Sequence, residues 1–193
     1  MTYTAQDYSK LLGSKHFSDG LMNNHFKLYQ GYVTNVNKIL DLLKTTELGT
    51  PTHVEIQRRL GWEFNGMRLH EYYFGNMEKD VVAMNSNSKL AQQIIKDFGS
   101  LENWEKDFRA CCAMRGIGWV SLVYDPVGKR LFNIWINEHD VGYFIGTTPL
   151  LVTDVFEHAY FTDFGVDRPA YIVAFMNSIN WKVPEHRFEE VMK

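Results

Sequence analysis

The first 115 residues carry apolar side chains three or four positions apart, which is the spacing of an amphipathic helix. The pattern predicts helices over residues 3–12, 17–43, 52–59, 67–77, 88–98 and 101–114. The side chains of Ser18, Thr50 and Ser100 can accept the free amide protons of a first helical turn, so we expect helices to begin beside them. The amino-terminal half is therefore predicted to be helical.

From residue 116 onward the pattern changes to β-rich runs. Residues 119–124 and 130–136 read as two strands joined by a turn sequence, Asp-Pro-Val-Gly-Lys, and residues 148–155 as a third. Arg168-Pro169 then opens a last helix, which we expect to continue to residue 181. The predicted fold is α+β, with an N-terminal helical hairpin followed by a three-stranded antiparallel sheet and surrounding helices. We divide it into an N-terminal helical domain, residues 1–87, and a C-terminal α+β domain, residues 88–193.

The composition narrows the kinds of partner. A chain of 193 residues that is 45% hydrophobic can bury a full core. Its net charge of −3 and its lack of long basic runs argue against a nucleic acid or a membrane surface as partner. No apolar run approaches the roughly 18 residues of a membrane span, and no signal peptide is evident, so we expect a cytoplasmic protein. The adjacent Cys111 and Cys112 would form a badly strained disulfide and read as core residues in a reducing compartment.

Asp154 and His158 lie four residues apart in an otherwise apolar run, PLLVTDVFEHAYF. Burying a carboxylate without a partner costs several kcal/mol, so this pair needs compensation, which a bound metal would supply. The alternative is a helix-capping carboxylate beside a helix histidine, because the DxxxH spacing alone is a weak motif.

Two further histidines lie in aromatic surroundings. His25, Tyr29 and Tyr32 fall on one face of the first long helix, and His70 precedes the aromatic run Glu-Tyr-Tyr-Phe. A single backbone carbonyl can satisfy an imidazole. Each histidine is therefore either a buried core residue or a metal ligand.

The residues from 154 to 181, DVFEHAYFTDFGVDRPAYIVAFMNSINW, resemble the signature of the iron/manganese superoxide dismutases. That signature reads Asp-x-Trp-Glu-His-Ala-Tyr, with Arg-Pro-x-Tyr and Asn-Trp further along. GIGWVS at residues 116–121 and YVTNVN at residues 32–37 resemble two other segments of the family. The resemblance runs through nearly the whole chain.

The resemblance implies one iron or manganese ion per subunit, bound by His25, His70, Asp154 and His158. Three imidazoles and a carboxylate suit either redox metal better than they suit structural zinc. A gap-free match would place Asn24 at the first ligand position, but asparagine is a poor ligand, so we favour His25. The stretch from Phe64 to His70 is two residues shorter than is usual in the family.

Three more residues gain expected roles from the resemblance. Tyr32 corresponds to the family's gateway tyrosine and Trp119 to its active-site tryptophan. His139 stands where many members have a glutamine that hydrogen-bonds to metal-bound solvent, so we expect it to influence metal preference. Its alternative reading is a loop histidine without a role.

The family resemblance also implies a homodimer, with a tetramer left open. Glu157 corresponds to a residue that bridges to the ligand histidine of the other subunit. Arg168 corresponds to a basic residue that supports this acidic region, or else forms a simple salt bridge at a helix start. Phe156 stands in place of a tryptophan, and Leu28 and Phe161 replace a histidine and a tyrosine that pair across the interface.

The function implied by the resemblance is superoxide dismutation, in which a single bound ion is alternately reduced and oxidised while superoxide becomes oxygen and hydrogen peroxide. The sequence favours iron, and use of either metal is compatible with it. The alternative is a non-catalytic structural or interaction protein descended from the family. A non-haem iron oxygenase would need open coordination positions, which the third histidine argues against. For an anionic substrate we expect positive charge near the entrance, from Lys27 and Arg68.

Overall fold

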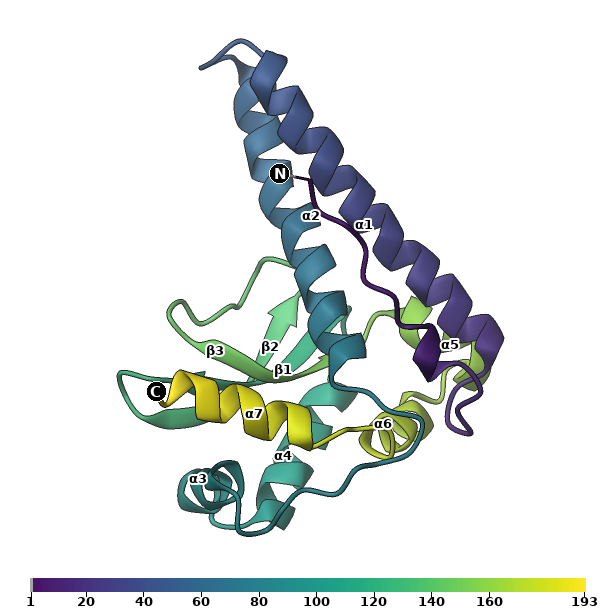
Figure 1. The fold of residues 1–193 in the computed structure, drawn as a ribbon, viewed down its shortest axis with the longest axis vertical. Coiled ribbons are helices and arrows are strands. Elements are labelled where there is room, and N and C mark those ends of the chain that lie inside the picture. The colour runs from purple at the N-terminus through teal and green to yellow at the C-terminus, as the bar shows by residue number, and fades with distance from the viewer. Residues whose placement is uncertain (1) are drawn as a thin grey trace.

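The computed structural model describes residues 2–193. Two long helices, α1 (Asp19–Thr45) and α2 (Pro51–Gly75), form a hairpin that projects from the rest of the molecule (Figure 1). Ser18 begins α1 by accepting the Leu21 amide proton at 3.1 Å, and Thr50 begins α2 by accepting that of His53 at 3.2 Å. Both helix starts agree with the sequence prediction because the capping oxygens precede the apolar periodicity directly.

The C-terminal part holds a small sheet surrounded by helices. Its strands are β1 (Gly118–Asp125), β2 (Arg130–Asn137) and β3 (Thr148–Asp154), in the antiparallel order β2-β1-β3. The helices are α3 (Lys89–Phe98), α4 (Leu101–Ala113), α5 (Phe161–Phe164), α6 (Arg168–Met176) and α7 (Lys182–Val191), with a 3₁₀ turn, η2 (Glu157–Ala159), after β3. The central strand places Trp119 directly beside Asp154 in the register with β3. The predicted α+β fold is confirmed.

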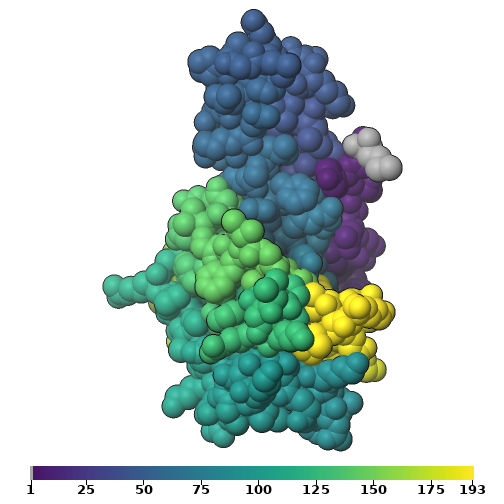
Figure 2. Space-filling model, turned by 90° about the vertical axis from the view of Figure 1, so that its left-hand side faces the viewer, coloured from purple at the N-terminus to yellow at the C-terminus, as the bar shows by residue number. Residues whose placement is uncertain are grey.

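One continuous hydrophobic core joins the hairpin to the sheet. The connection between β2 and β3, in green in Figure 2, lies against the blue surface of the hairpin, and Trp62 of α2 donates a hydrogen bond to Glu138 there. This contact brings residues on the second helix next to the loop that carries His139.

The predicted helix over residues 3–12 is wrong. Only Ser9–Leu11 forms a short 3₁₀ turn, η1, and residues 2–8 run along the hairpin without regular structure. Asn37 of α1 satisfies the backbone of Tyr3 twice, through Asn37 Oδ1 with the Tyr3 amide and Asn37 Nδ2 with the Tyr3 carbonyl, both at 2.9 Å. The apolar residues at helical spacing therefore belong to an extended strap rather than to a helix. The side chain of Asn37 provides the hydrogen-bond partners that the backbone of this strap would otherwise lack.

Two other boundaries differ from the prediction. Helix α2 is continuous across residues 60–66, where the sequence pattern suggested a break. The final predicted helix, residues 168–181, in fact ends at Met176, because the residues after α6 pair with the segment after α2, with Glu78 N donating to Ser178 O at 2.7 Å. Helix α7, which begins at Lys182, was not predicted. Within residues 2–193, no helix combines the length and the apolar character that a membrane span needs.

Candidate metal centre

Four side chains from four elements meet at one point between the hairpin and the sheet. They are His25 of α1, His70 of α2, Asp154 at the end of β3 and His158 of η2, and their candidate ligand atoms all lie within 4.8 Å of one another. The Oδ2 atom of Asp154 lies 3.2 Å from Nε2 of His25, 3.1 Å from Nε2 of His158 and 3.7 Å from Nε2 of His70. All three ring nitrogens therefore point at the same carboxylate oxygen.

The structure brings His25 into this cluster and leaves the neighbouring Asn24 exposed. Consecutive residues of a helix point about 100° apart, so only one of the two can face the core. The choice of His25 over Asn24 agrees with this placement.

The hydrogen bond of His70 leaves its other nitrogen available to a ligand. Nδ1 donates to the Gly66 carbonyl at 2.6 Å, so Nε2 of the neutral ring carries a lone pair. That Nε2 is buried and has no hydrogen-bond partner within the described part of the chain. A buried polar atom without a partner is unfavourable, and a cation at the centre of the cluster would satisfy it.

The charges of the cluster also suit a cation. Burial lowers the pKa of both His25 and His70, so both rings are neutral at pH 7. Burial alone would raise the pKa of Asp154, but the adjacent His158 and His25 outweigh it and lower that pKa below its usual value. Two neutral buried imidazoles beside an ionised carboxylate form a donor set that fits a divalent or trivalent metal ion.

His139, Tyr32 and Trp119 form a hydrogen-bonded chain next to this cluster. The Trp119 indole N–H donates to Nδ1 of His139 at 3.0 Å. An indole nitrogen can only donate, so Nδ1 must be unprotonated and the ring proton sits on Nε2. Nε2 then donates to the Tyr32 hydroxyl oxygen at 2.8 Å. The Tyr32 hydroxyl proton remains free for another acceptor.

The two titratable members of this hydrogen-bonded chain, His139 and Tyr32, are neutral at pH 7. Burial lowers the pKa of His139 to about 4, with Asp154 opposing the shift only in part. Burial also raises the pKa of Tyr32, and the nearby carboxylates of Asp154 and Glu63 raise it further. The Tyr32 ring lies 5.1 Å from that of His70, so this pair of neutral proton donors borders the metal cluster directly.

Residues 86–187 match the family described as iron/manganese superoxide dismutases, C-terminal domain. The chain is 37% identical to "Superoxide dismutase [Fe]" of Methanothermobacter thermautotrophicus, over 88% of this chain and 84% of that one. It is 33% identical to "Superoxide dismutase [Mn] 2" of Halobacterium salinarum, over 96% and 92% of the two chains. It is 32% identical to "Superoxide dismutase [Fe]" of Pyrobaculum aerophilum, over 88% and 82%.

The chain belongs to the iron/manganese superoxide dismutase family. The family predicted from the 154–181 segment is therefore confirmed. Its relatives carry iron in some names and manganese in others, so membership does not by itself select one metal.

Phe156, which stands where family members often have tryptophan, fills the space between the metal cluster and His139. Its ring stacks on His158 with centroids 5.2 Å apart and lies 5.0 Å from the ring of His139. The substitution therefore keeps an aromatic wall at this position.

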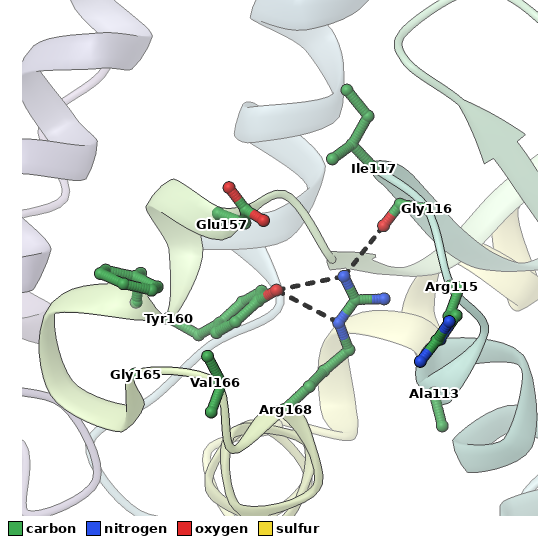
Figure 3. Close-up of a pocket in the computed structure, with 10 residues that line it drawn as sticks. Ala113, Arg115, Gly116, Ile117, Glu157, Tyr160, Gly165, Val166 and Arg168 are labelled. Carbon is green, nitrogen blue, oxygen red and sulfur yellow. Dashed lines mark hydrogen bonds between the residues drawn. The ribbon is translucent and has the colours of Figure 1, made fainter.

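A surface pocket of about 570 Å³ is lined by Tyr160, Arg168 and Glu157, the residue before the candidate ligand His158 (Figure 3). Arg168 donates to the Tyr160 hydroxyl at 3.1 Å and to the Gly116 carbonyl at 2.9 Å. Arg168 forms no ion pair with a carboxylate of residues 2–193. It therefore does not make the salt bridge at a helix start that was the alternative reading of the sequence. Glu157 is exposed in this pocket without a partner in the described chain.

The sequence interpretation missed a group of residues on α2. Trp62 packs on His139 with ring centroids 4.4 Å apart, and Gly66 both lies against the Tyr32 ring and bonds His70. Both residues fall in the stretch that was not predicted to be helical. A continuous helix would have placed Trp62, Gly66 and His70 on one face at intervals of four residues, which is the signal that could have found them.

Lys27 and Arg68, which we expected to supply positive charge near the entrance, are not among the residues that line the surface cleft at Tyr32. Arg68 forms an ion pair with Glu71 and lies over the rings of Tyr3 and Phe64, away from the residues that surround Tyr32. Lys27 is exposed on α1. The arginine that does lie beside Tyr32 is Arg59.

Proposed function

We propose that this protein is a superoxide dismutase that uses one iron or manganese ion per subunit, held by His25, His70, Asp154 and His158. The observation that carries the proposal is the convergence of these four donors beside the neutral Tyr32–His139 pair. Family membership supports it, since curated relatives are named superoxide dismutases with either metal. The presence of all four donors in one cluster also argues against a non-catalytic descendant.

His25, His70, Asp154 and His158 would hold an iron or manganese ion, which would supply the one-electron redox chemistry that converts two superoxide ions into oxygen and hydrogen peroxide. The second product needs two protons. Tyr32 keeps its hydroxyl proton at pH 7, since its pKa is raised. Because the Tyr32 oxygen accepts a hydrogen bond from Nε2 of His139, that proton points away from the His139 imidazole. We assign to Tyr32 the role of a donor to the bound substrate, refilled from solvent.

Trp119 and His139 are positioning residues, because they orient Tyr32 rather than react themselves. Trp119 holds Nδ1 of His139, which fixes the tautomer and turns Nε2–H towards Tyr32. His139 is fully enclosed, by Phe156 and Trp62 among others, so water cannot replace this bond. Groups that orient the surroundings of a metal influence its redox potential, and we therefore propose that His139 influences the preference between iron and manganese.

We further propose a homodimer built on the pocket around Glu157. His158 is the only member of the cluster, among the residues described, whose side chain is partly exposed, at 29%. A carboxylate at Glu157 can reach His158 of the partner subunit if two copies meet there. Arg168 supports this face by tying Tyr160 to the chain before β1. A tetramer, a cytoplasmic location and the division at residues 87 and 88 stay predictions from the sequence.

Elemental analysis of the purified protein tests the function, with dismutation assayed on the same sample after reloading with iron or with manganese. We expect about one metal per chain and activity with at least one of the two ions. The His139→Gln variant should change the ratio of iron-supported to manganese-supported activity. A folded protein that takes up neither ion and shows no activity would contradict the proposal and favour a structural descendant.

A further inference from the structure

A surface cleft of about 240 Å³ leads to Tyr32 between α1 and α2. The described residues that line it are Leu28, Gly31, Tyr32, Asn35, Arg59, Trp62 and Glu63. Among them Arg59 carries the one positive charge and Glu63 the one negative charge. On the α1 side of the mouth, Leu28 and Gly31 offer no polar side chain, and Asn35 adds an uncharged one.

Arg59 and Glu63 form an oriented pair rather than a simple surface ion pair. Nε and Nη2 of Arg59 donate to Oε1 of Glu63 at 3.0 and 2.8 Å, and Nδ2 of Asn35 donates to Oε2 at 3.3 Å. The Glu63 side chain is only 4% exposed, whereas that of Arg59 is 46% exposed. The positive end of the pair therefore faces the solvent and the negative end is buried beneath it.

Trp62 holds the guanidinium group in place and connects it to the site. The Cζ atom of Arg59 lies 3.9 Å from the centre of the Trp62 ring, which is a cation–π contact. The same ring lies 5.7 Å from Tyr32 and 4.4 Å from His139. The cation is thus fixed at the entrance of a path whose inner end is the Tyr32–His139 pair.

We propose that Arg59 captures anionic superoxide at the mouth of this cleft, while Glu63 and Trp62 hold its guanidinium group ready. This inference rests on the proposed dismutase function. Nη1 of Arg59 makes no hydrogen bond with residues 2–193, so it keeps two N–H donors for an incoming anion. A fixed cation in a cleft with low-dielectric walls concentrates anions and raises their rate of arrival, which matters in a protein with a net charge of −3.

The kinetic test compares Arg59→Gln with Arg58→Gln. Arg58 is the next residue on the same helix, is paired with the exposed Glu55 and does not line the cleft, so its substitution changes the net charge equally. We expect Arg59→Gln to lower kcat/KM for superoxide roughly two- to tenfold at low ionic strength and to weaken its salt dependence, with kcat unchanged. Arg58→Gln should resemble the wild type.

A third variant separates the charge of Arg59 from the stability of the pair. Glu63→Gln keeps the cation but removes the carboxylate that holds it in place, so kcat/KM should fall less than in Arg59→Gln. If Arg59→Gln is unstable because Glu63 is left unpaired, the double variant Arg59→Gln/Glu63→Gln replaces it, since it buries no unpaired charge. The double variant should show the same loss of kcat/KM.

A second measurement does not depend on the metal or on turnover. Trp62 is half-buried in the cleft, and its fluorescence can be isolated as the difference between the wild type and Trp62→Phe. Iodide, a small anion, should quench this signal roughly twofold less in Arg59→Gln than in the wild type, whereas neutral acrylamide should quench both equally.

The outcomes keep the two proposals apart. A metal-loaded wild type without dismutation would overturn the proposed function, and the iodide experiment would still report on the anion site. An active wild type in which Arg59→Gln matches Arg58→Gln in kcat/KM and in iodide quenching would overturn the role of Arg59 alone.

Discussion

At the scale of single residues, His139 is defined by its two hydrogen bonds. It accepts from Trp119 at Nδ1 and donates to Tyr32 at Nε2. A glutamine amide offers the same two functions, because its oxygen accepts and its nitrogen donates. What glutamine cannot do is take up a proton. If this position corresponds to the glutamine that the family resemblance implies, histidine can make the same two contacts and adds a titratable group.

The first prediction follows from the pKa of His139, which falls from the usual 6.5 to about 4 on folding. Between pH 6.5 and pH 4 the unfolded chain binds more protons than the folded one, so the free energy of unfolding decreases as the pH falls through this window. Relative to His139→Gln, the wild type should lose about 2 kcal/mol of stability between pH 7 and pH 5. Urea denaturation of both proteins at matched metal content measures the difference. Parallel stability curves would contradict a neutral, buried His139.

The second prediction concerns Gly66, whose position admits no side chain. A Cβ there would lie 2.6 Å from Cδ1 and Cε1 of the Tyr32 ring, which is anchored through its hydroxyl to His139. Gly66→Ala should displace Tyr32 and lower both dismutation and stability, the latter by about 1–3 kcal/mol. Gly61→Ala in the same helix is the control, since nothing lies within 4 Å of its added methyl group, and it should raise stability by up to about 1 kcal/mol. Equal effects of the two substitutions would contradict the close contact.

Which site residues could be predicted depends on whether a local motif marks them. Asp154 and His158 share one short segment, and their placement together follows from a spacing of four residues. Trp62 and Arg59 have no such mark, because they reach Tyr32 only when α2 is continuous and packed against α1. Their positions beside Tyr32 result from the packing of α2 against α1, and the spacing of apolar residues within one segment cannot predict such packing.

At the scale of elements, the end of α2 is fastened to β3 by the buried side chain of Asn76. Its Nδ2 donates to the carbonyls of Tyr73 at 2.8 Å and Val152 at 3.2 Å, and its Oδ1 accepts the Val152 amide proton at 3.1 Å. Arg187 of α7 donates to the same Oδ1 at 3.3 Å. One side chain therefore fixes the helix that carries His70 against the strand that carries Asp154.

The third prediction is that Asn76→Ala loosens the metal centre without touching it. The substitution leaves the amide and carbonyl of Val152 buried without partners, which should lower the free energy of unfolding by about 2–4 kcal/mol. The metal content per chain should fall as well, because the spacing between His70 and Asp154 is no longer held. Asn103→Ala, at an exposed site that bonds one carbonyl, should cost less than about 1 kcal/mol and leave metal content unchanged. Full metal occupancy in Asn76→Ala would contradict the prediction, because the metal-binding side chains would then keep their positions without Asn76.

The elements that the sequence predicted well are those with their own start signals. Helices α1, α2 and α4 begin at Ser18, Thr50 and Ser100, as expected from capping. The strap before α1 and the break between α6 and α7 have another origin. In the strap, backbone groups bond to Asn37, and after α6 they bond to the segment that follows α2. Because these distant partners satisfy the backbone, no helix forms there despite the apolar spacing.

At the scale of the whole molecule, the site is assembled only where the hairpin meets the sheet. Residues on the hairpin supply two imidazoles, the end of β3 supplies the carboxylate, and the turn after it supplies the third imidazole. The sequence could predict these four donors through the family signature, but their common centre depends on the core that spans both parts. The proposed second copy would extend the same arrangement, because Glu157, the residue before His158, lines the pocket on which the two copies would meet.

The last prediction tests that second copy. Phe161 is 58% exposed on the wall of the pocket around Glu157, and a large exposed apolar side chain beside a polar centre is typical of a protein interface. Phe161→Asp should convert the dimer to a monomer in light scattering at micromolar concentration, because a buried, unpaired carboxylate would face the partner. Val127→Asp, which places the same charge on another exposed apolar residue in the β1–β2 turn, should remain dimeric. The monomer should also bind its metal less firmly, since His158 would lose the carboxylate of the partner subunit that orients its ring. Dimers of equal stability in both variants would place the interface on another face of the molecule.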